Sequence, residues 1–289
     1  MTRAGIVTVC GKPNAGKSTL LNRIVGQKLA ITSPKPQSTR DRIVGIHSTA
    51  DVQMIVLDTP GLLEPKYALQ RSMKQTARQA LADADVIIYV ADATDGAPAP
   101  LEVAASLPAP PAAPVITAMN KVDLLDADRR AVLERLQPGA HFISAASGDG
   151  VDALLAAAAE RLPESPFLYP ADELSTQTTR FFVAELVRET ALEQLEDEVP
   201  YSVACEVEEF REERNPVYIR AVLYVERDSQ KRILIGAGGS RIREIGRTAR
   251  TKVEELIGAP VYLDLWVKVL HNWRRNARAL SRFGYRLEE

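Results

Sequence analysis

The pattern G-x-x-x-x-G-K-S occurs at Gly11–Ser18, between a strand-like run (Ala4–Cys10) and a helix-like run (Lys17–Val25). In that setting the glycines let main-chain N–H groups surround phosphate oxygens, and the start of the helix adds positive charge. Lys17 would neutralise the β- and γ-phosphates, and the Ser18 hydroxyl would bind Mg²⁺. The pattern predicts a loop that binds a nucleoside triphosphate, with contacts from Gly11, Lys12, Pro13, Asn14, Ala15, Gly16, Lys17, Ser18 and Thr19.

Three later motifs follow the carboxyl ends of strand-like runs. They are Asp58-Thr59-Pro60-Gly61 after Gln53–Asp58, Asn120-Lys121-Val122-Asp123 after Val115–Asn120, and Ser144-Ala145 after His141–Ser144. We expect Asp58 to reach Mg²⁺ through a water molecule and the Gly61 N–H to sense the γ-phosphate. Thr59, Pro60 and Leu62 complete the expected nucleotide contacts of the first motif.

The Asp123 carboxylate selects the base. It can accept hydrogen bonds from the N1–H and exocyclic amine of guanine, whereas adenine has no such donors on that edge, and a buried unpaired carboxylate is costly. We expect Asn120 to reach the base edge and the Lys121 stem to pack on the base. A main-chain N–H of Ser144 or Ala145 would bind guanine O6. Together these motifs predict binding of GTP and GDP.

A polar segment, Ser33–Arg40, lies between the phosphate loop and Asp58. A hydroxyl there must complete the Mg²⁺ site with Ser18 and Asp58, and we choose Thr39 over Ser38. Lys17, Thr39 and Gly61 are the expected catalytic groups. Leu62 stands where Ras-like enzymes carry a water-positioning glutamine, so unaided hydrolysis should be slow. Asn14 is a candidate K⁺ ligand, although a plain turn residue is an equal interpretation.

Strand-like and helix-like runs alternate through the first half of the chain. A further strand-like run is Asp85–Asp92, and helix-like runs are Met73–Ala82, Asp126–Leu136 and Val151–Leu162. This alternation predicts an α/β P-loop GTPase domain with a mostly parallel sheet. The Ala/Pro-rich segment Asp95–Pro114 is expected to be a loop or one short helix.

The pattern changes near Pro163–Gln177. We expect a GTPase domain over residues 1–168, a linker over 169–180 and a second domain over 181–289 that ends in a basic helix. The second domain should run helix, strand, strand, helix, helix, strand, with the two middle strands antiparallel. These elements are Phe182–Leu195, Val203–Phe210, Val217–Val225, Ser229–Ile235, Gly239–Ile257 and Val261–Val269.

A G-x-x-G loop, Gly236-Ala237-Gly238-Gly239, precedes the longest predicted helix of this domain. Such a loop can clamp four nucleotides of single-stranded RNA. Residues 231–252 carry seven basic side chains against one acidic, and residues 268–289 carry six against two, on a chain of net charge −2. This predicts RNA binding through the loop with Arg241 and Arg243. A merely solvated basic face is the alternative, and Trp273 or Phe283 could stack on bases but would more commonly be core.

Bulk composition limits the setting of the protein. The chain has 289 residues and only two cysteines, Cys10 and Cys205, far apart. We therefore expect a reducing cytosol and no disulfide framework. The first residues lack a signal peptide's apolar core, and no run of 18 apolar residues predicts a membrane span.

The motifs together resemble the Era family of bacterial GTPases, over nearly the whole chain. The resemblance rests on GKPNAGKSTLLN at 11–22, PQSTRDR at 36–42, DTPGLLEP at 58–65, NKVD at 120–123, SA at 144–145 and ILIGAGGSRIREIG at 233–246. It implies a GTPase domain joined to a type II KH domain, which binds the 3′ end of 16S rRNA during 30S subunit maturation. It also implies a cytosolic protein with peripheral attachment to the inner membrane. The loop lacks a lysine often found there, which shifts the expected phosphate contacts to Arg241 and Arg243.

We therefore expect a monomeric, Mg²⁺-dependent GTP hydrolase whose nucleotide state governs access of a KH surface to rRNA. The alternative is a membrane-associated signalling GTPase whose basic C-terminal domain meets anionic lipid or a protein partner. The G-x-x-G loop favours RNA, since lipid binding does not need it. A role in tRNA modification or as a double-domain ribosome factor is disfavoured, because there is one set of nucleotide motifs and no C-terminal catalytic cysteine.

Overall fold

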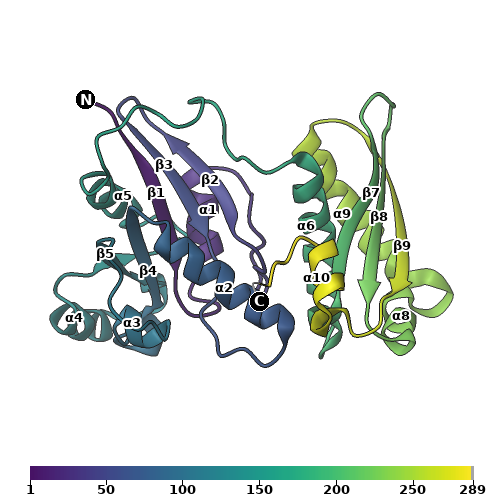
Figure 1. Ribbon diagram of the computed structural model, residues 1–289, viewed down its shortest axis with the longest axis horizontal. Helices are drawn as coiled ribbons and strands as arrows, with labels where there is room; N and C mark the ends of the chain where they lie inside the picture. Colours follow the sequence, from purple (N-terminus) through teal and green to yellow (C-terminus); the bar gives the residue numbers. More distant parts are fainter. Residues whose placement is uncertain (288–289) are drawn as a thin grey trace. The chain divides into compact units, whose positions relative to one another are not determined.

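The computed structural model describes residues 1–287 and divides into two compact units (Figure 1). The first unit comprises Met1–Pro65 and Met73–Thr176, and the second comprises Lys66–Ser72 and the chain from Gln177 onward. The division falls inside the expected linker. Glu288 and Glu289, which enter the predicted second domain and its charge count, lie outside the described residues.

The first unit is built on a six-stranded sheet in the order β2-β3-β1-β4-β5-β6. Neighbouring strands are parallel except for the antiparallel pair β2–β3, which confirms the predicted mostly parallel sheet. The apolar pattern does not predict β2, because Gly45 and His47 interrupt it. The strands are β1 (Arg3–Cys10), β2 (Ile43–Ser48), β3 (Val52–Asp58), β4 (Val86–Asp92), β5 (Val115–Asn120) and β6 (His141–Ile143).

Helices cover both faces of this sheet (Figure 1). On one face the Thr8 hydroxyl donates to the carbonyl of Ala80 in α2, at 2.6 Å. On the other, α1 approaches β2 so closely that a Cβ on Gly45 would lie 2.7 Å from a methyl group of Leu21. The segment 95–114 forms one short helix, α3. The helices are α1 (Lys17–Val25), α2 (Ala68–Ala82), α3 (Leu101–Ala104), α4 (Ala127–Leu136) and α5 (Val151–Ala159), with 3₁₀ turns η1 (Ala93–Asp95) and η2 (Val122–Leu124).

The chain after α5 is fastened along the β2–β3 edge of the sheet. The Ile46 N–H donates to the carbonyl of Leu174 at 2.8 Å, and the Ser175 hydroxyl donates to the carbonyl of Val44. The side chain of Gln53, fully buried, accepts the N–H groups of Leu168 and Tyr169 and donates to the Tyr169 carbonyl. Much of the expected linker is therefore an ordered part of the first unit.

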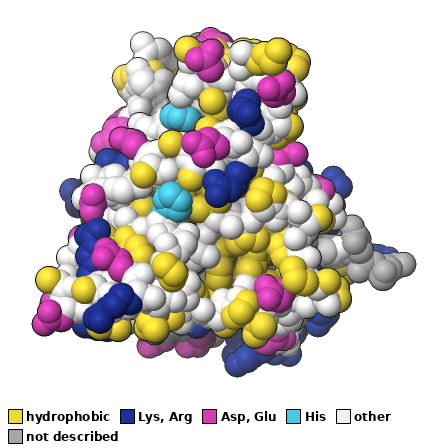
Figure 2. All heavy atoms as spheres, turned by 90° about the vertical axis from the view of Figure 1, so that its left-hand side faces the viewer, with side chains coloured by type: hydrophobic (Ala, Val, Ile, Leu, Met, Phe, Trp, Pro, Cys, Tyr) yellow, Lys and Arg dark blue, Asp and Glu magenta, His cyan; other side chains and the backbone are white. Residues whose placement is uncertain are grey.

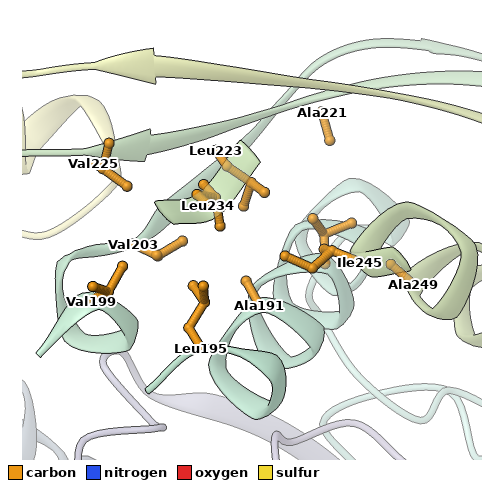
Figure 3. Packing of buried hydrophobic residues seen from close by; sticks show 11 residues of the cluster. Ala191, Leu195, Val199, Val203, Ala221, Leu223, Val225, Leu234, Ile245 and Ala249 are labelled. Atoms are coloured by element: carbon orange, nitrogen blue, oxygen red, sulfur yellow. The ribbon is translucent and has the colours of Figure 1, made fainter. Parts of the chain in front are cut away.

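The second unit confirms the predicted α+β order. Its sheet runs β7-β8-β9, with β7–β8 antiparallel and β8–β9 parallel. One face packs on helices around a core that includes Leu195, Leu223, Leu234 and Ile245 (Figure 3). The elements are α6 (Thr179–Gln194), α7 (Val199–Ser202), β7 (Ala204–Arg211), β8 (Val217–Val225), α8 (Asp228–Ile235), η3 (Ala237–Gly239), α9 (Ser240–Ile257), β9 (Val261–Val269), η4 (Trp273–Arg275) and α10 (Ala277–Arg282).

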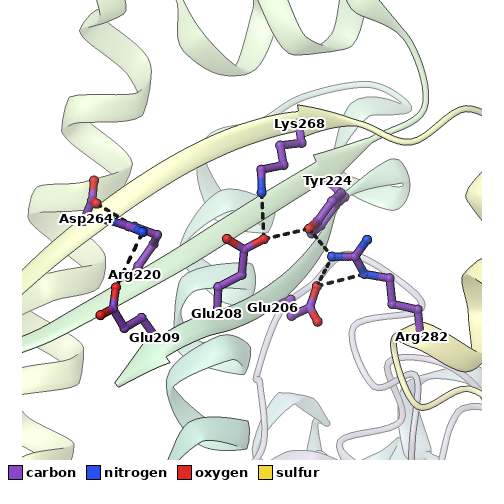
Figure 4. A network of polar contacts seen from close by, with 8 residues as sticks. All are labelled: Glu206, Glu208, Glu209, Arg220, Tyr224, Asp264, Lys268 and Arg282. Atoms are coloured by element: carbon purple, nitrogen blue, oxygen red, sulfur yellow. Dashed lines mark hydrogen bonds and ion pairs between the residues drawn. The ribbon is translucent and has the colours of Figure 1, made fainter. Parts of the chain in front are cut away.

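The other face of this sheet carries basic and acidic side chains that form ion pairs with one another (Figure 4). Ion pairs join Arg220 to Asp264, Lys268 to Glu208 and Arg282 to Glu206. The expected basic C-terminal helix is the short helix α10. The ion pair between Arg282 and Glu206 neutralises part of its positive charge within the unit. Trp273 is fully buried and donates to the Ser202 carbonyl at 2.8 Å, and Phe283 packs against it. Both aromatic side chains belong to the packing of the unit, and the buried Trp273 cannot stack on a base.

Candidate nucleotide site and RNA-binding loop

The phosphate loop connects β1 to α1 and passes very close to neighbouring atoms. Gly11 has φ +148°, and a Cβ there would lie 2.1 Å from the carbonyl oxygen of Val90. A Cβ on Gly16 (φ +96°) would lie 2.1 Å from the side-chain nitrogen of Asn120. Only glycine fits both positions. The motif spacing thus reflects where the backbone must bend and pass against β4 and β5.

A pocket of about 480 Å³ opens above this loop. Its walls come from the phosphate loop, from the polar segment that precedes β2 and from the loops after β3 and β5. The lining residues are Pro13, Asn14, Gly16, Lys17, Ser18, Thr19, Ile31, Thr32, Ser33, Pro34, Gln37, Ser38, Thr39, Gly61, Leu63 and Lys121. The structure therefore brings most of the expected phosphate contacts into one cavity.

The three expected Mg²⁺ ligands meet at one side of the pocket. The Ser18 hydroxyl donates to Oδ2 of Asp58 at 2.6 Å, and the Thr39 hydroxyl lies 3.0 Å from that of Ser18. The other carboxylate oxygen of Asp58, Oδ1, is buried and has no hydrogen-bond partner within the described chain. Two hydroxyls and a carboxylate oxygen are the hard donors that Mg²⁺ prefers. The residues present fit the ion.

Burial sets the charge balance of the pocket floor. Burial lowers the pKa of Lys17, against the opposing attraction of Asp58. Burial likewise raises the pKa of the Asp58 carboxyl, opposed by Lys17 and by hydrogen bonds from Ser18 and Thr39. Lys17 also donates to the carbonyl of Lys12 at 2.9 Å. A phosphate anion beside Lys17 and a cation beside Asp58 would stabilise the charged forms of these two side chains, as water does for exposed groups.

Asn14 and Leu62, both expected beside the phosphates, lie in different surroundings: Asn14 lines the pocket and Leu62 does not. Asn14 has φ 62° and donates from Nδ2 to the carbonyl of Pro34 at 2.7 Å, so it links the phosphate loop to the polar segment. The Leu62 side chain packs against an apolar cluster that contains Tyr89, while its N–H donates to the Gly11 carbonyl. Leu63, one residue later, lines the pocket instead.

Asn120 ties together loops that are far apart in sequence. Its Nδ2 donates to the carbonyl of Ala15 at 2.8 Å, and its Oδ1 accepts the Ala145 N–H at 2.9 Å. The hydroxyl of Thr59 is also used within the protein, donating to the carbonyl of Val9. The sequence did not predict these hydrogen bonds of Asn120 and Thr59, because their partners are main-chain groups. Asp58, Thr59, Pro60, Ser144 and Ala145 do not line the pocket directly.

Lys121 is held by a carboxylate that sequence reasoning also missed. Its Nζ lies 2.6 Å from Oδ2 of Asp92, at the end of the neighbouring strand β4. Burial opposes ionisation of Asp92, but hydrogen bonds from Lys121 and Thr94 outweigh it and lower the pKa of this carboxyl. Asp123 follows in η2 with an exposed side chain. The register of β4 against β5 could have indicated the Asp92–Lys121 pair.

The G-x-x-G loop of the second unit joins α8 to α9. Gly236, Gly238 and Gly239 all have positive φ, between +55° and +78°. Gly238 faces open space, Arg241 and Arg243 are exposed, and a Cβ on Gly239 would lie 3.4 Å from the Arg243 guanidinium. The loop therefore presents bare backbone beside two arginines, as contact with a sugar-phosphate chain requires.

Ion pairs concentrate the available positive charge at this loop. Farther along α9, Arg247 pairs with Glu244, Arg250 lies 3.9 Å from Glu254, and Lys252 bridges Glu189 and Glu193. Within residues 231–252, all of them described, the four cations without an ion pair are those flanking the loop, namely Lys231, Arg232, Arg241 and Arg243. On the face of the first unit drawn in Figure 2, by contrast, basic and acidic side chains are mixed.

Family models match both parts of the chain. A model described as 50S ribosome-binding GTPase matches residues 6–121, and a KH domain model matches residues 198–274. The fold and the site therefore define a P-loop GTPase domain followed by a KH domain. No helix in the described part of the chain is long and apolar enough to cross a membrane.

Known proteins narrow this class to one family. GTPase Era from Pseudomonas putida strain W619 is 44% identical over 98% of this chain and 97% of its own length. A variant of Aquifex aeolicus Era bound to GDP·AlF4⁻ matches with 39% identity and a TM-score of 0.92, over 99% of this chain and all of that one. Era in complex with MgGDPNP and nucleotides 1506–1542 of 16S ribosomal RNA matches with 39% identity and a TM-score of 0.93, at the same coverage. The chain belongs to the Era family of GTPases, which confirms the resemblance drawn from its motifs.

The double link made by Asn120 gives a first testable prediction. Asn120→Ala should lower the free energy of unfolding without nucleotide by about 1–3 kcal/mol, because the buried Ala145 N–H and Ala15 carbonyl would lose their partner. Urea unfolding of the nucleotide-free protein measures this. Asp123→Ala, at an exposed neighbouring position, should leave the free energy unchanged. Equal values for Asn120→Ala and the wild type would contradict the linking role.

Proposed function

We propose that this protein is a GTP-hydrolysing switch that binds 16S rRNA near its 3′ end and assists maturation of the 30S subunit. The observation that carries the proposal is that Ser18, Thr39 and Asp58 meet beside a buried lysine, next to a phosphate-binding loop, with one Asp58 carboxylate oxygen that has no hydrogen-bond partner within residues 1–287. Membership of the Era family and the G-x-x-G loop support the RNA part.

Hydrolysis proceeds by in-line attack of water on the γ-phosphate. Lys17 and the main-chain N–H groups of the phosphate loop bind the phosphate oxygens, and the Gly61 N–H meets the γ-phosphate as charge moves toward the leaving group. Ser18 and Thr39 would hold Mg²⁺ directly and Asp58 would hold it through water, and the bound ion would neutralise phosphate charge. Thr39 belongs to the segment that leads into β2, so loss of the γ-phosphate releases that segment.

The base is read by the loops after β5 and β6. Asp123 accepts from the guanine N1–H and amine, and the Lys121 stem, steadied by Asp92, packs on the base. Asn120 positions the phosphate loop and the Ser144–Ala145 turn together and meets the base edge. ATP lacks the donors for Asp123, so the site selects GTP and GDP.

A potassium ion held near Asn14 would add positive charge beside the γ-phosphate to that of Lys17. Leu62 is packed in an apolar cluster and cannot orient water, so unaided hydrolysis is slow. Asn14 stands at the pocket wall next to the Pro34 carbonyl, where a monovalent cation would find oxygen ligands. Hydrolysis should therefore run faster in K⁺ than in Na⁺, as phosphate release would show. Equal rates in the two salts would contradict this assignment.

The second unit carries the RNA. Gly236, Ala237, Gly238 and Gly239 clamp a short single strand, with Arg241 and Arg243 on its phosphates. The protein acts as a monomer in the cytoplasm, with peripheral contact to the inner membrane, and its larger partner is the 30S subunit. A lipid-directed signalling GTPase is the second candidate, but four basic residues without an ion pair among the described residues flank a G-x-x-G loop, which RNA needs and lipid does not.

Substitution of one loop glycine should separate the two activities. Gly238→Asp places a carboxylate and an unfavourable φ of +55° where the RNA backbone approaches, so affinity for a 3′-end rRNA fragment should fall at least about tenfold. GTP hydrolysis in the absence of RNA should be unchanged. Fluorescence anisotropy and phosphate release measure the two properties.

Gly258→Asp provides the matched control. Gly258 also has a positive φ (+74°) and open space around it, but it ends α9, away from the loop. It should keep wild-type RNA affinity. Retained affinity in Gly238→Asp, or an equal loss in both variants, would count against the loop as the RNA site.

A further inference from the structure

The turn after β6 contains one main-chain donor that the protein does not use. Among residues 144–149, all of them described, every N–H donates within the turn or to Asn120 except that of Ala146. The acceptors are the Asp149 carbonyl for Ser144, Asn120 Oδ1 for Ala145, the Ser144 hydroxyl for Ser147, the Ser144 carbonyl for Gly148 and the Ser147 hydroxyl for Asp149. The Ala145 N–H, an expected donor to guanine O6, is thus already engaged by Asn120.

Arg23 controls the direction of the unused donor. This residue lies in the last turn of α1, the helix that begins at the phosphate loop. Its Nε donates to the Ala145 carbonyl at 3.2 Å, and its Nη2 donates to the Ala146 carbonyl. A planar trans peptide points its carbonyl oxygen and its N–H in opposite directions. Holding the Ala145 carbonyl toward Arg23 therefore holds the Ala146 N–H away from it.

The guanidinium suits this task better than other cations would. Two donors in one rigid plane fix two successive carbonyls, and with them the orientation of the peptide between Ala145 and Ala146. A lysine would supply a single point charge on a flexible stem. The same helix then places both ends of the nucleotide, the phosphates at Lys17 and the base turn at Arg23, six residues apart.

We propose that Arg23 is a positioning residue for base selection: it orients the Ala146 N–H toward the O6 atom of guanine. This inference rests on the proposed binding of guanine nucleotides and adds one donor and one orienting side chain to it. Asp123 reads the donors of the base, and the oriented Ala146 peptide reads its acceptor. Adenine carries an amine donor at that position, so a fixed N–H rejects it as well.

Nucleotide analogues test the assignment on the full-length protein. GDP and 6-thio-GDP differ only in the acceptor at position 6, whereas GDP and XDP differ at the amine that Asp123 reads. In Arg23→Met, GDP should dissociate about tenfold faster, as expected on loss of a charged pair of hydrogen bonds. The ratio of GDP to 6-thio-GDP affinity should fall toward one, while the ratio of GDP to XDP affinity stays at its wild-type value.

Two variants serve as controls. Arg23→Lys keeps the charge and one donor, and should restore part of the GDP to 6-thio-GDP ratio. Arg161→Met removes another exposed arginine that donates to a main-chain carbonyl, that of Ala157, and should match the wild type. Equal weakening of all three nucleotides in Arg23→Met would mean a general structural role and would overturn the inference. A wild type that does not prefer GDP over ADP would instead overturn the proposed function.

Discussion

A buried pair of opposite charges, Lys17 and Asp58, is the constraint on which the rest of the first unit depends. Each pKa is displaced by burial, and Asp58 keeps one carboxylate oxygen without a partner among the described residues. Such a pair is expensive in a protein interior unless further charges complete it. The fold brings the two charges together because Asp58 ends β3, Lys17 follows β1 through the phosphate loop, and the carboxyl ends of these two parallel strands lie side by side. A phosphate and a magnesium ion would supply the complementary charges, so the cost of burying Lys17 and Asp58 favours binding of the nucleotide.

The sequence predicted the parts of the site whose residue types are dictated by chemistry. Glycines that approach Val90 and Asn120, a lysine for phosphate and hydroxyls for Mg²⁺ can be recognised from spacing alone. The links made through main-chain atoms could not be predicted in that way. Asn120 to Ala15 and Arg23 to Ala145 depend on which loops the sheet brings together, and any residue can supply a carbonyl. The edge strand β2 was missed because antiparallel edge strands need no continuous apolar run.

Charge along the chain also differs from charge in space. The sequence places thirteen basic side chains in two segments of the second unit, yet acidic residues from α6, β7 and elsewhere in the unit neutralise several of them. Four of those without an ion pair among the described residues, Lys231, Arg232, Arg241 and Arg243, flank the G-x-x-G loop, where three glycines with positive φ leave the backbone bare. The fold therefore leaves positive charge beside the bare backbone of the loop, where electrostatic attraction can act together with close backbone contact.

We propose that the nucleotide bound at Lys17 and Asp58 governs RNA binding by the second unit. The most direct test is the affinity of the full-length protein for a short single-stranded RNA that copies the 3′ end of 16S rRNA, with a GTP analogue or with GDP, over a range of salt concentrations. We expect tight, salt-sensitive binding with the triphosphate analogue and markedly weaker binding with GDP. Equal affinity in the two nucleotide states, or no binding in either beside normal GTP hydrolysis, would contradict it.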